Sequence, residues 1–179
     1  MPDQIYDVQS VIGSRIRAIP NYPKPGITFR DITPLLKDGD AFSKSIDLLA
    51  DAVSEYRFDY ISGIEARGFI IASALAYKLG TGFIPIRKKG KLPFDKIGKT
   101  YTLEYGAETI EIHKDSVEKG SNVLVVDDLL ATGGTASTAA DLITSLGANV
   151  AGFAFIVELS ALKGRLRLGS HRISSLIIY

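Results

Sequence analysis

The stretch from Val123 to Thr135, VLVVDDLLATGGT, carries the strongest indication of the fold in this chain. It opens with the apolar run Val123–Val126, which is typical of a strand buried on both faces of a parallel sheet. Two adjacent acids, Asp127 and Asp128, follow the strand, and a Thr-Gly-Gly-Thr turn then leads into a helix that we predict over Thr135–Leu146. The stretch therefore predicts a strand–turn–helix unit of an α/β protein.

Strands and helices alternate on both sides of this unit. We predict strands at Asp59–Ile64, Gly82–Ile86, Val123–Val126, Val150–Val157 and Leu176–Ile178, and helices at about Ala41–Tyr56, Phe69–Leu79 and Thr135–Leu146. This order predicts an α/β fold, a mostly parallel twisted sheet with helices on both faces. Ligands of such sheets bind at the carboxyl ends of the strands, which is where Asp127 and Asp128 lie.

The N-terminal part of the chain, residues 1–38, does not follow this alternation. Apolar residues from Gln4 to Ile19 recur at helical spacing, which predicts a helix that stops at Pro20. The segment Pro20–Leu36 contains four prolines, and each proline fixes φ and removes a backbone donor. We therefore predict an ordered connection, or hood, with a short strand at Ile27–Arg30.

A second exception is the polar segment from Lys88 to Asp115. Polar and apolar residues alternate in Tyr101–Tyr105 and again in Thr109–Ile112, with Gly106 between the two runs. This pattern predicts a two-stranded flap over residues 93–112 that is exposed and lies outside the core. We expect the flap to close over bound substrates and to exclude water, and an ordinary exposed hairpin is the alternative.

The composition favours one folded domain over residues 1–179, because 46% of the residues are hydrophobic. The 21 basic and 20 acidic residues create no overall field for nucleic acid or an anionic membrane. The absence of cysteine excludes disulfides, thiolate zinc sites and a cysteine nucleophile, and the two histidines are too few for a multi-histidine metal site. Because we find neither a signal-peptide pattern nor an apolar run long enough to span a membrane, we expect a cytoplasmic protein.

The glycine turn and the acid pair together suit one ligand. Backbone N–H groups, threonine hydroxyls and a helix N-terminus form a cradle for a phosphate, and carboxylates accept hydrogen bonds from ribose hydroxyls. The stretch therefore predicts a seat for a ribose 5-phosphate, with a helix-capping turn as the alternative. It is not a Walker A loop, because it lacks the Gly-Lys-Ser/Thr sequence. The predicted phosphate-binding residues are Ala131, Thr132, Gly133, Gly134 and Thr135.

Two further groups of cations follow predicted strands. Arg67 lies in the sequence Glu65–Phe69, which opens a helix, and Arg87, Lys88 and Lys91 belong to a basic run after the next strand. Taken alone, each group reads as a solvated charged turn. Beside a ribose 5-phosphate seat, we expect these cations to bind further negative charge on the ligand.

These motifs together resemble the type I phosphoribosyltransferases, and DDLLATGGT is similar to the adenine-specific members of that family. The resemblance spans nearly the whole chain, because further motifs match in order and approximate spacing. They are PGITFRDITPLLKD (Pro25–Asp38), IEARGF (Ile64–Phe69), IPIRKKGKLP (Ile84–Pro93), YTLEYG (Tyr101–Gly106) and ELSALKGRLRL (Glu158–Leu168). The resemblance implies the family fold with its hood and flap. It also implies a purine-salvage reaction that converts adenine and 5-phosphoribosyl 1-pyrophosphate to AMP and pyrophosphate.

The resemblance also implies roles for individual residues. The implied catalytic residues are Glu104, Asp127 and Asp128; Glu104 either handles the adenine proton or helps to hold the flap closed. Implied ligands of the substrate phosphates, besides the glycine turn, are Arg67, Arg87, Lys88, Lys91 and Tyr105. Implied adenine contacts are Thr28, Phe29, Arg30, Leu129 and Leu130. Core packing is the alternative for Phe29 and for both leucines, and relatives often carry valine at the position of Thr28.

Other implied features concern the backbone, the cofactor and the assembly. The family often has a cis peptide between the residues matching Glu65 and Ala66. Mg²⁺ is expected to arrive on the pyrophosphate, with no direct protein ligand. A homodimer is expected, with Arg87 near the partner's site. Two alternatives are a xanthine or hypoxanthine–guanine enzyme, which the wording of DDLLATGGT and FRDITP disfavours, and a non-catalytic nucleotide sensor, which the lack of net basicity disfavours.

Overall fold

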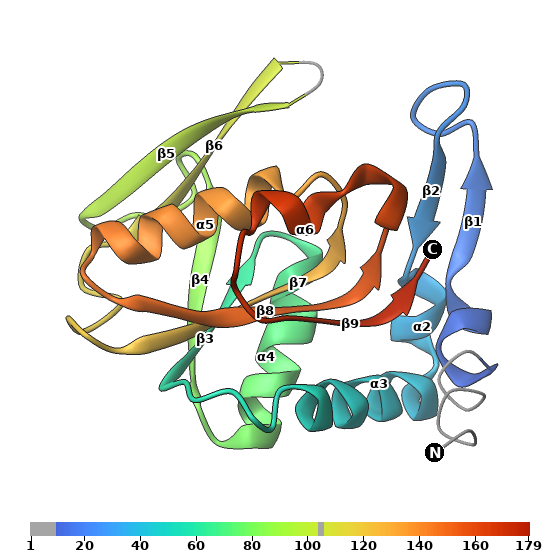
Figure 1. Cartoon of the computed structure of the whole chain (residues 1–179), viewed down its shortest axis with the longest axis horizontal. Coiled ribbons are helices and arrows are strands. Elements are labelled where there is room, and N and C mark those ends of the chain that lie inside the picture. Colours follow the sequence, from blue (N-terminus) through green and yellow to red (C-terminus); the bar gives the residue numbers. More distant parts are fainter. Residues whose placement is uncertain (1–9, 104–105) are drawn as a thin grey trace. The chain divides into compact units, whose positions relative to one another are not determined.

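The computed structural model describes residues 10–103 and 106–179 (Figure 1). The chain forms two compact units, residues 1–48 and residues 49–179. The elements described in the first unit are the 3₁₀ helix η1 (Gly13–Arg15), β1 (Arg17–Pro20), β2 (Thr28–Asp31), α2 (Thr33–Lys37) and the start of α3 (Gly39–Ala52).

The first unit contains a small antiparallel sheet. β1 pairs with β2, with Arg17 opposite Asp31 and Pro20 opposite Thr28. The predicted strand at Ile27–Arg30 is thereby confirmed to within one residue. The predicted helix up to Ile19 is wrong at its end, where η1 gives way to a strand. The backbone of β1 finds its hydrogen-bond partners in β2, and Pro20 can end such an edge strand because its missing N–H is not needed there.

The second unit is built on a sheet whose described strands run in the order β5-β6-β4-β3-β7-β8-β9. The strands β4-β3-β7-β8-β9 are parallel, and β6 pairs antiparallel with β4 and with β5, which confirms the predicted mostly parallel sheet. The strand bounds are β3 (Tyr60–Ile64), β4 (Gly82–Lys88), β5 (Lys96–Leu103), β6 (Gly106–His113), β7 (Asn122–Leu130), β8 (Asn149–Glu158) and β9 (Ile173–Ile178).

Helices cover both faces of this sheet, as predicted. Figure 1 shows α5 (Gly134–Ser145) in front of the sheet and α4 (Arg67–Leu79) behind it. Val123 and Val125 of β7 share one buried cluster with Leu142 and Ile143 of α5, because alternate residues of a strand point to the same face. The short elements η2 (Ser160–Leu162) and α6 (Gly164–Arg167) follow β8. No helix in the described part of the chain has both the length and the apolar composition needed to cross a membrane.

The flap has the two antiparallel strands that were predicted. β5 pairs with β6 from Lys96 opposite His113 to Leu103 opposite Gly106. The prediction that the flap lies outside the core is wrong, because Tyr101, Ile110 and Ile112 are buried in the cluster beneath α5. The reason is that β6 also pairs with β4, so the base of the flap extends the main sheet, while its far end projects beyond the sheet (Figure 1).

Candidate active site

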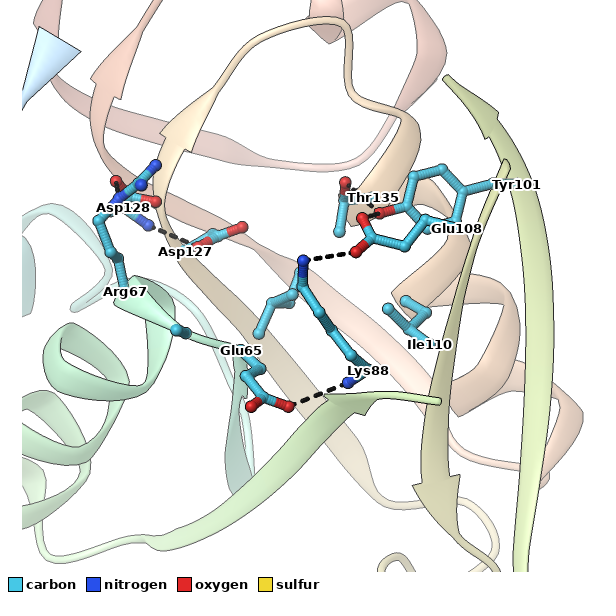
Figure 2. Close-up of a pocket in the computed structure, with 11 residues that line it drawn as sticks. Glu65, Arg67, Lys88, Tyr101, Glu108, Ile110, Asp127, Asp128 and Thr135 are labelled. Carbon is cyan, nitrogen blue, oxygen red and sulfur yellow. Dashed lines mark hydrogen bonds and ion pairs between the residues drawn. The ribbon is translucent and has the colours of Figure 1, made fainter. Parts of the chain in front are cut away.

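The carboxyl ends of β3 and β7, which are neighbouring parallel strands, border a cavity of about 300 Å³. The end of β3 and the start of α4 contribute one wall, the end of β7 contributes a second, and the base of the flap faces them (Figure 2). This position agrees with the rule that ligands bind at strand carboxyl ends. The residues that line the cavity are Ile64, Glu65, Ala66, Arg67, Lys88, Tyr101, Glu108, Ile110, Asp127, Asp128 and Thr135.

The predicted acid pair lies in this cavity, but its two members differ. Asp128 is buried, with 6% of its side chain exposed, and its carboxylate accepts a hydrogen bond of 2.5 Å from Nε of Arg67. Asp127 is partly buried, and its carboxylate accepts the backbone N–H of Asp128 at 2.9 Å. Burial, together with the adjacent charge of Asp128, raises the pKa of Asp127 well above its usual value. Asp128 is thus held by a cation, whereas the charged form of Asp127 is disfavoured.

The predicted phosphate loop follows directly. Gly133 has a left-handed φ of 79°, and no side chain caps the helix that begins at Gly134. The first N–H groups of a helix have no partners within it, so this end of α5 can donate to an anion. A smaller hollow of about 70 Å³ lies over the loop and is lined by Asp127, Leu129, Leu130, Ala131, Thr132, Gly133, Gly134, Thr135 and Ala136.

The two leucines predicted to contact adenine line that hollow, Leu129 being partly buried and Leu130 buried. Leu130 also belongs to the core cluster beneath α5. Core packing is therefore confirmed for Leu130, and contact with adenine stays a prediction for both residues.

The predicted basic run divides between two environments. Arg87 forms a two-pronged ion pair with Glu65, with N···O distances of 3.1 and 3.2 Å, and donates a hydrogen bond of 3.0 Å to the carbonyl oxygen of Lys91. The hydrogen bonds from Arg87 lower the pKa of Glu65. Lys88 lines the cavity, whereas Arg87 and Lys91 are not among the lining residues. The peptide bond between Glu65 and Ala66 is cis, as the resemblance implied.

Two residues of the cavity wall, Tyr101 and Glu108, were not predicted as site residues. The Tyr101 hydroxyl accepts a hydrogen bond of 3.0 Å from the Thr135 hydroxyl and donates one of 2.9 Å to Glu108. Glu108 also pairs with Nζ of Lys88 at 2.5 Å (Figure 2). Burial raises the pKa of Tyr101 to about 12, so its hydroxyl stays protonated and can donate. The alternation of residues in the flap was the available signal, because it places Tyr101 on the inward face of its strand.

Five of the predicted site residues do not belong to the described residues of the second unit. Glu104 and Tyr105 lie outside the described residues. Thr28, Phe29 and Arg30 lie on β2 of the first unit, where the ring of Phe29 meets the ring of Tyr22 edge-on at 5.4 Å between centroids. The roles of all five residues stay predictions.

Known proteins resemble this chain over most of its length. The family model described as "Phosphoribosyl transferase domain" matches residues 33–174. The adenine phosphoribosyltransferases of Thermotoga neapolitana and Solibacter usitatus are both 54% identical to the chain; the alignments cover 92% and 93% of this chain and 96% of each relative.

Solved structures agree with these sequence matches. Adenine phosphoribosyltransferase from Thermoanaerobacter pseudethanolicus superimposes with a TM-score of 0.93 at 50% identity, covering 96% of this chain and 99% of that one. The Saccharomyces cerevisiae enzyme, complexed with an imino-altritol bisphosphate and adenine, gives a TM-score of 0.89 at 40% identity with the same coverage of both chains.

Proposed function

This chain belongs to the family of phosphoribosyl transferase domains, and we propose that it is an adenine phosphoribosyltransferase. It transfers the 5-phosphoribosyl group of 5-phosphoribosyl 1-pyrophosphate to adenine, and it forms AMP and pyrophosphate in purine salvage. The observation that carries this proposal is an identity of about half to enzymes of that name over more than nine-tenths of the chain. The acid pair beside an uncapped, glycine-led helix start supplies the matching chemistry.

The reaction is a displacement at C1 of the ribose. The bond between C1 and the pyrophosphate oxygen breaks, the bond between C1 and N9 of adenine forms, and the adenine proton leaves to a base. Such reactions pass through a transition state with positive charge near C1, which nearby carboxylates stabilise. We assign that task, and the binding of the ribose hydroxyls, to Asp127 and Asp128. We propose that Glu104 accepts the adenine proton or helps to hold the flap closed. The proposed adenine contacts are Thr28, Phe29, Arg30, Leu129 and Leu130.

The 5-phosphate and the pyrophosphate of the substrate bind at different anion sites. The 5-phosphate binds in the turn from Ala131 to Thr135, where the left-handed Gly133 and the uncapped start of α5 expose donors. The pyrophosphate binds at Arg67 and Lys88, which line the larger cavity beside Asp128 and Glu108. The proposed additional phosphate ligands are Arg87, Lys91 and Tyr105.

Mg²⁺ is the proposed cofactor, bound to the pyrophosphate of the incoming substrate. Three cavity carboxylates, those of Glu65, Glu108 and Asp128, already pair with a cation of the protein. Among the described residues, no cluster of three or more His, Cys, Asp or Glu side chains is placed to hold a metal. This donor set fits an ion that arrives on the substrate. When bound, Mg²⁺ neutralises charge on the leaving group.

We also propose a cytoplasmic homodimer. The outer face of α4 supports the dimer, because Ile70 and Tyr77 lie two helical turns apart on one side and are 43% and 91% exposed. α4 begins at Arg67 in the cavity wall, so a partner on this face lies close to the site. Such a position suits the expected approach of Arg87 to the partner's site.

The test of the proposed function is a steady-state assay with four purine bases, each with 5-phosphoribosyl 1-pyrophosphate and Mg²⁺. Adenine should give AMP, and guanine, hypoxanthine and xanthine should be poorer by about 10²-fold or more, as for a site built around one base edge. Comparable turnover of guanine would replace this proposal with the hypoxanthine–guanine activity.

A further inference from the structure

A continuous hydrogen-bonded chain crosses the cavity from one proposed phosphate site to the other. It runs from Thr135 at the start of α5, through Tyr101 of β5 and Glu108 of β6, to Lys88 at the end of β4. Figure 2 shows these four side chains converging on one side of the cavity. This series of hydrogen bonds therefore links the 5-phosphate loop to Lys88, the proposed ligand of the pyrophosphate, through the flap.

The direction of each hydrogen bond shows which donors are occupied. The hydroxyl of Thr135 donates to Tyr101, and the ammonium group of Lys88 donates to the carboxylate of Glu108. The hydrogen-bonded ammonium group of Lys88 lowers the pKa of Glu108, so this carboxylate is charged at neutral pH. The Thr135 hydroxyl and one N–H of Lys88 are thus engaged by Tyr101 and Glu108, and a bound phosphate group would compete for each of these donors.

Tyr101 and Glu108 lie directly opposite each other in the antiparallel register of β5 and β6. They are also hydrogen-bonded to each other, so they form a single rung of the flap. A displacement of this rung that frees Lys88 also frees Thr135, because one hairpin carries both acceptors. The binding of an anion at one end should therefore prepare the other end.

We propose that Tyr101 and Glu108 are positioning residues that couple the 5-phosphate site to the pyrophosphate site. Tyr101 holds the hydroxyl of Thr135, and Glu108 holds the ammonium group of Lys88, until the substrate displaces this rung. The displacement moves the flap as both phosphate groups bind. Binding of the first anion includes the free-energy cost of breaking these hydrogen bonds. The second anion then binds to a site whose donor is already free, so the two binding events are positively coupled. This inference rests on the proposed function, since it takes the two anion sites from it.

The coupling is measured with the two halves of the substrate, ribose 5-phosphate and Mg²⁺-pyrophosphate, which together do not react. Calorimetry gives the Kd of pyrophosphate with and without saturating ribose 5-phosphate. In the unaltered protein, ribose 5-phosphate should tighten pyrophosphate binding by about five-fold or more, the lower range of measured allosteric couplings. In Tyr101→Phe and Glu108→Gln, this coupling should disappear.

Each variant should also bind one of the two anions more tightly, a change in affinity that a merely structural role would not give. Glu108→Gln removes the charge that holds Lys88, so pyrophosphate alone should bind about two- to five-fold more tightly, as expected from loss of a partly exposed competing ion pair. Tyr101→Phe should likewise tighten ribose 5-phosphate alone. A damaged site would bind both ligands more weakly.

The matched control is Thr109→Val in the next rung of the same hairpin. Thr109 and Thr100 are hydrogen-bonded at 2.8 Å, and Thr100 precedes Tyr101, so this pair lies on the face of the flap turned away from the cavity. Thr109→Val should keep the coupling of the unaltered protein.

Absence of coupling in the unaltered protein, or its persistence in both Tyr101→Phe and Glu108→Gln, would overturn the inference. If the protein makes AMP but shows no coupling, only this inference fails. If it neither makes AMP nor binds either half of the substrate, the proposed function fails and the inference fails with it.

Discussion

Asp127 and Asp128 are adjacent and chemically identical, yet their environments differ at the scale of single atoms. Asp128 accepts a hydrogen bond from the side chain of Arg67, whereas Asp127 accepts the backbone N–H of Asp128 and lies beside the charge of that carboxylate. The pKa of Asp127 is therefore raised. A charged Asp127 destabilises the protein, and this cost suits the proposed role of an acid that faces a positively charged transition state.

The first prediction concerns the substitution Asp127→Asn. A carboxyl group whose pKa is raised by folding contributes stability below its usual pKa, and this contribution is lost as the pH rises through the folded pKa. At neutral pH the amide should therefore raise the Tm, while turnover falls by about 10²-fold or more, as for loss of one transition-state electrostatic contact. Thermal melts from about pH 4, the usual pKa of Asp, up to about pH 8, together with an AMP-forming assay, measure both effects.

Asp128→Asn is the matched control, because it leaves Arg67 without its carboxylate partner and should lower the Tm. The double variant should keep its fold and lose at least the same activity. Near-normal turnover of the double variant would show that the acid pair is not catalytic.

A second prediction at this scale concerns Gly133 in the phosphate loop. A Cβ atom at this position would lie 2.7 Å from the carbonyl oxygen of Gly164, and the φ of 79° disfavours any side chain. Gly133→Ala should therefore destabilise the protein by more than the ~1–2 kcal/mol of left-handed backbone strain, and it should weaken AMP binding. Urea unfolding and AMP titration measure the two effects.

Gly120 provides the matched control for Gly133, because its φ is 83° and no atom lies within 4 Å of its Cβ position. Gly120→Ala should show the strain of a left-handed residue and unchanged AMP binding. Equal effects of the two substitutions on AMP binding would contradict our view of the loop.

At the scale of elements, the flap is divided between two environments. Its inner face, with Tyr101, Ile110 and Ile112, is buried under α5, and Lys99 pairs with Asp141 of α5 at 2.7 Å. The pairing of β6 with β4 makes the base of the flap a continuation of the central sheet. Any movement of the flap must therefore leave the β4–β6 pairs in place and begin beyond them, at the level of Tyr101 and Glu108.

The third prediction tests that division. Ile112 is fully buried in β6, so Ile112→Ala should cost about 2–5 kcal/mol of unfolding free energy through lost burial and a cavity. Phe94, just before β5, is 64% exposed, and Phe94→Ala should change stability by no more than about 0.5 kcal/mol. Urea unfolding of both variants gives the comparison. A small effect of Ile112→Ala would show that the flap base is not part of the core.

At the scale of the whole molecule, the fourth prediction concerns the proposed homodimer. Tyr77→Glu places a charge on the exposed apolar face of α4 and should shift the protein toward monomer. Sedimentation velocity at assay concentration measures the shift. Leu166 of α6 is 78% exposed, and Leu166→Glu should leave the assembly unchanged. An unaltered protein that sediments as an active monomer would refute the dimer.

The sequence by itself determined the features that depend on neighbours along the chain. Apolar runs, helical spacing and glycine positions indicated the strand–helix alternation around Val123–Val126. The motif DDLLATGGT indicated the acid pair and the phosphate loop. The strand–helix alternation was confirmed in outline because strand burial and turn chemistry are properties of short segments, whereas the roles of the acid pair and of the phosphate loop stay predictions. The ends of elements were predicted less accurately: Arg17–Pro20 forms a strand because its pairing with β2 overrode the helical periodicity.

Only the tertiary structure decided which residues meet across elements. The pairing of β6 with β4 brought the flap base into the core, and the register of β5 and β6 placed Tyr101 beside Glu108 and both within reach of Lys88 and Thr135. The different environments of Asp127 and Asp128 likewise depend on Arg67, which is about 60 residues away in the sequence. Such contacts are set by the packing of distant segments, and no local pattern encodes them.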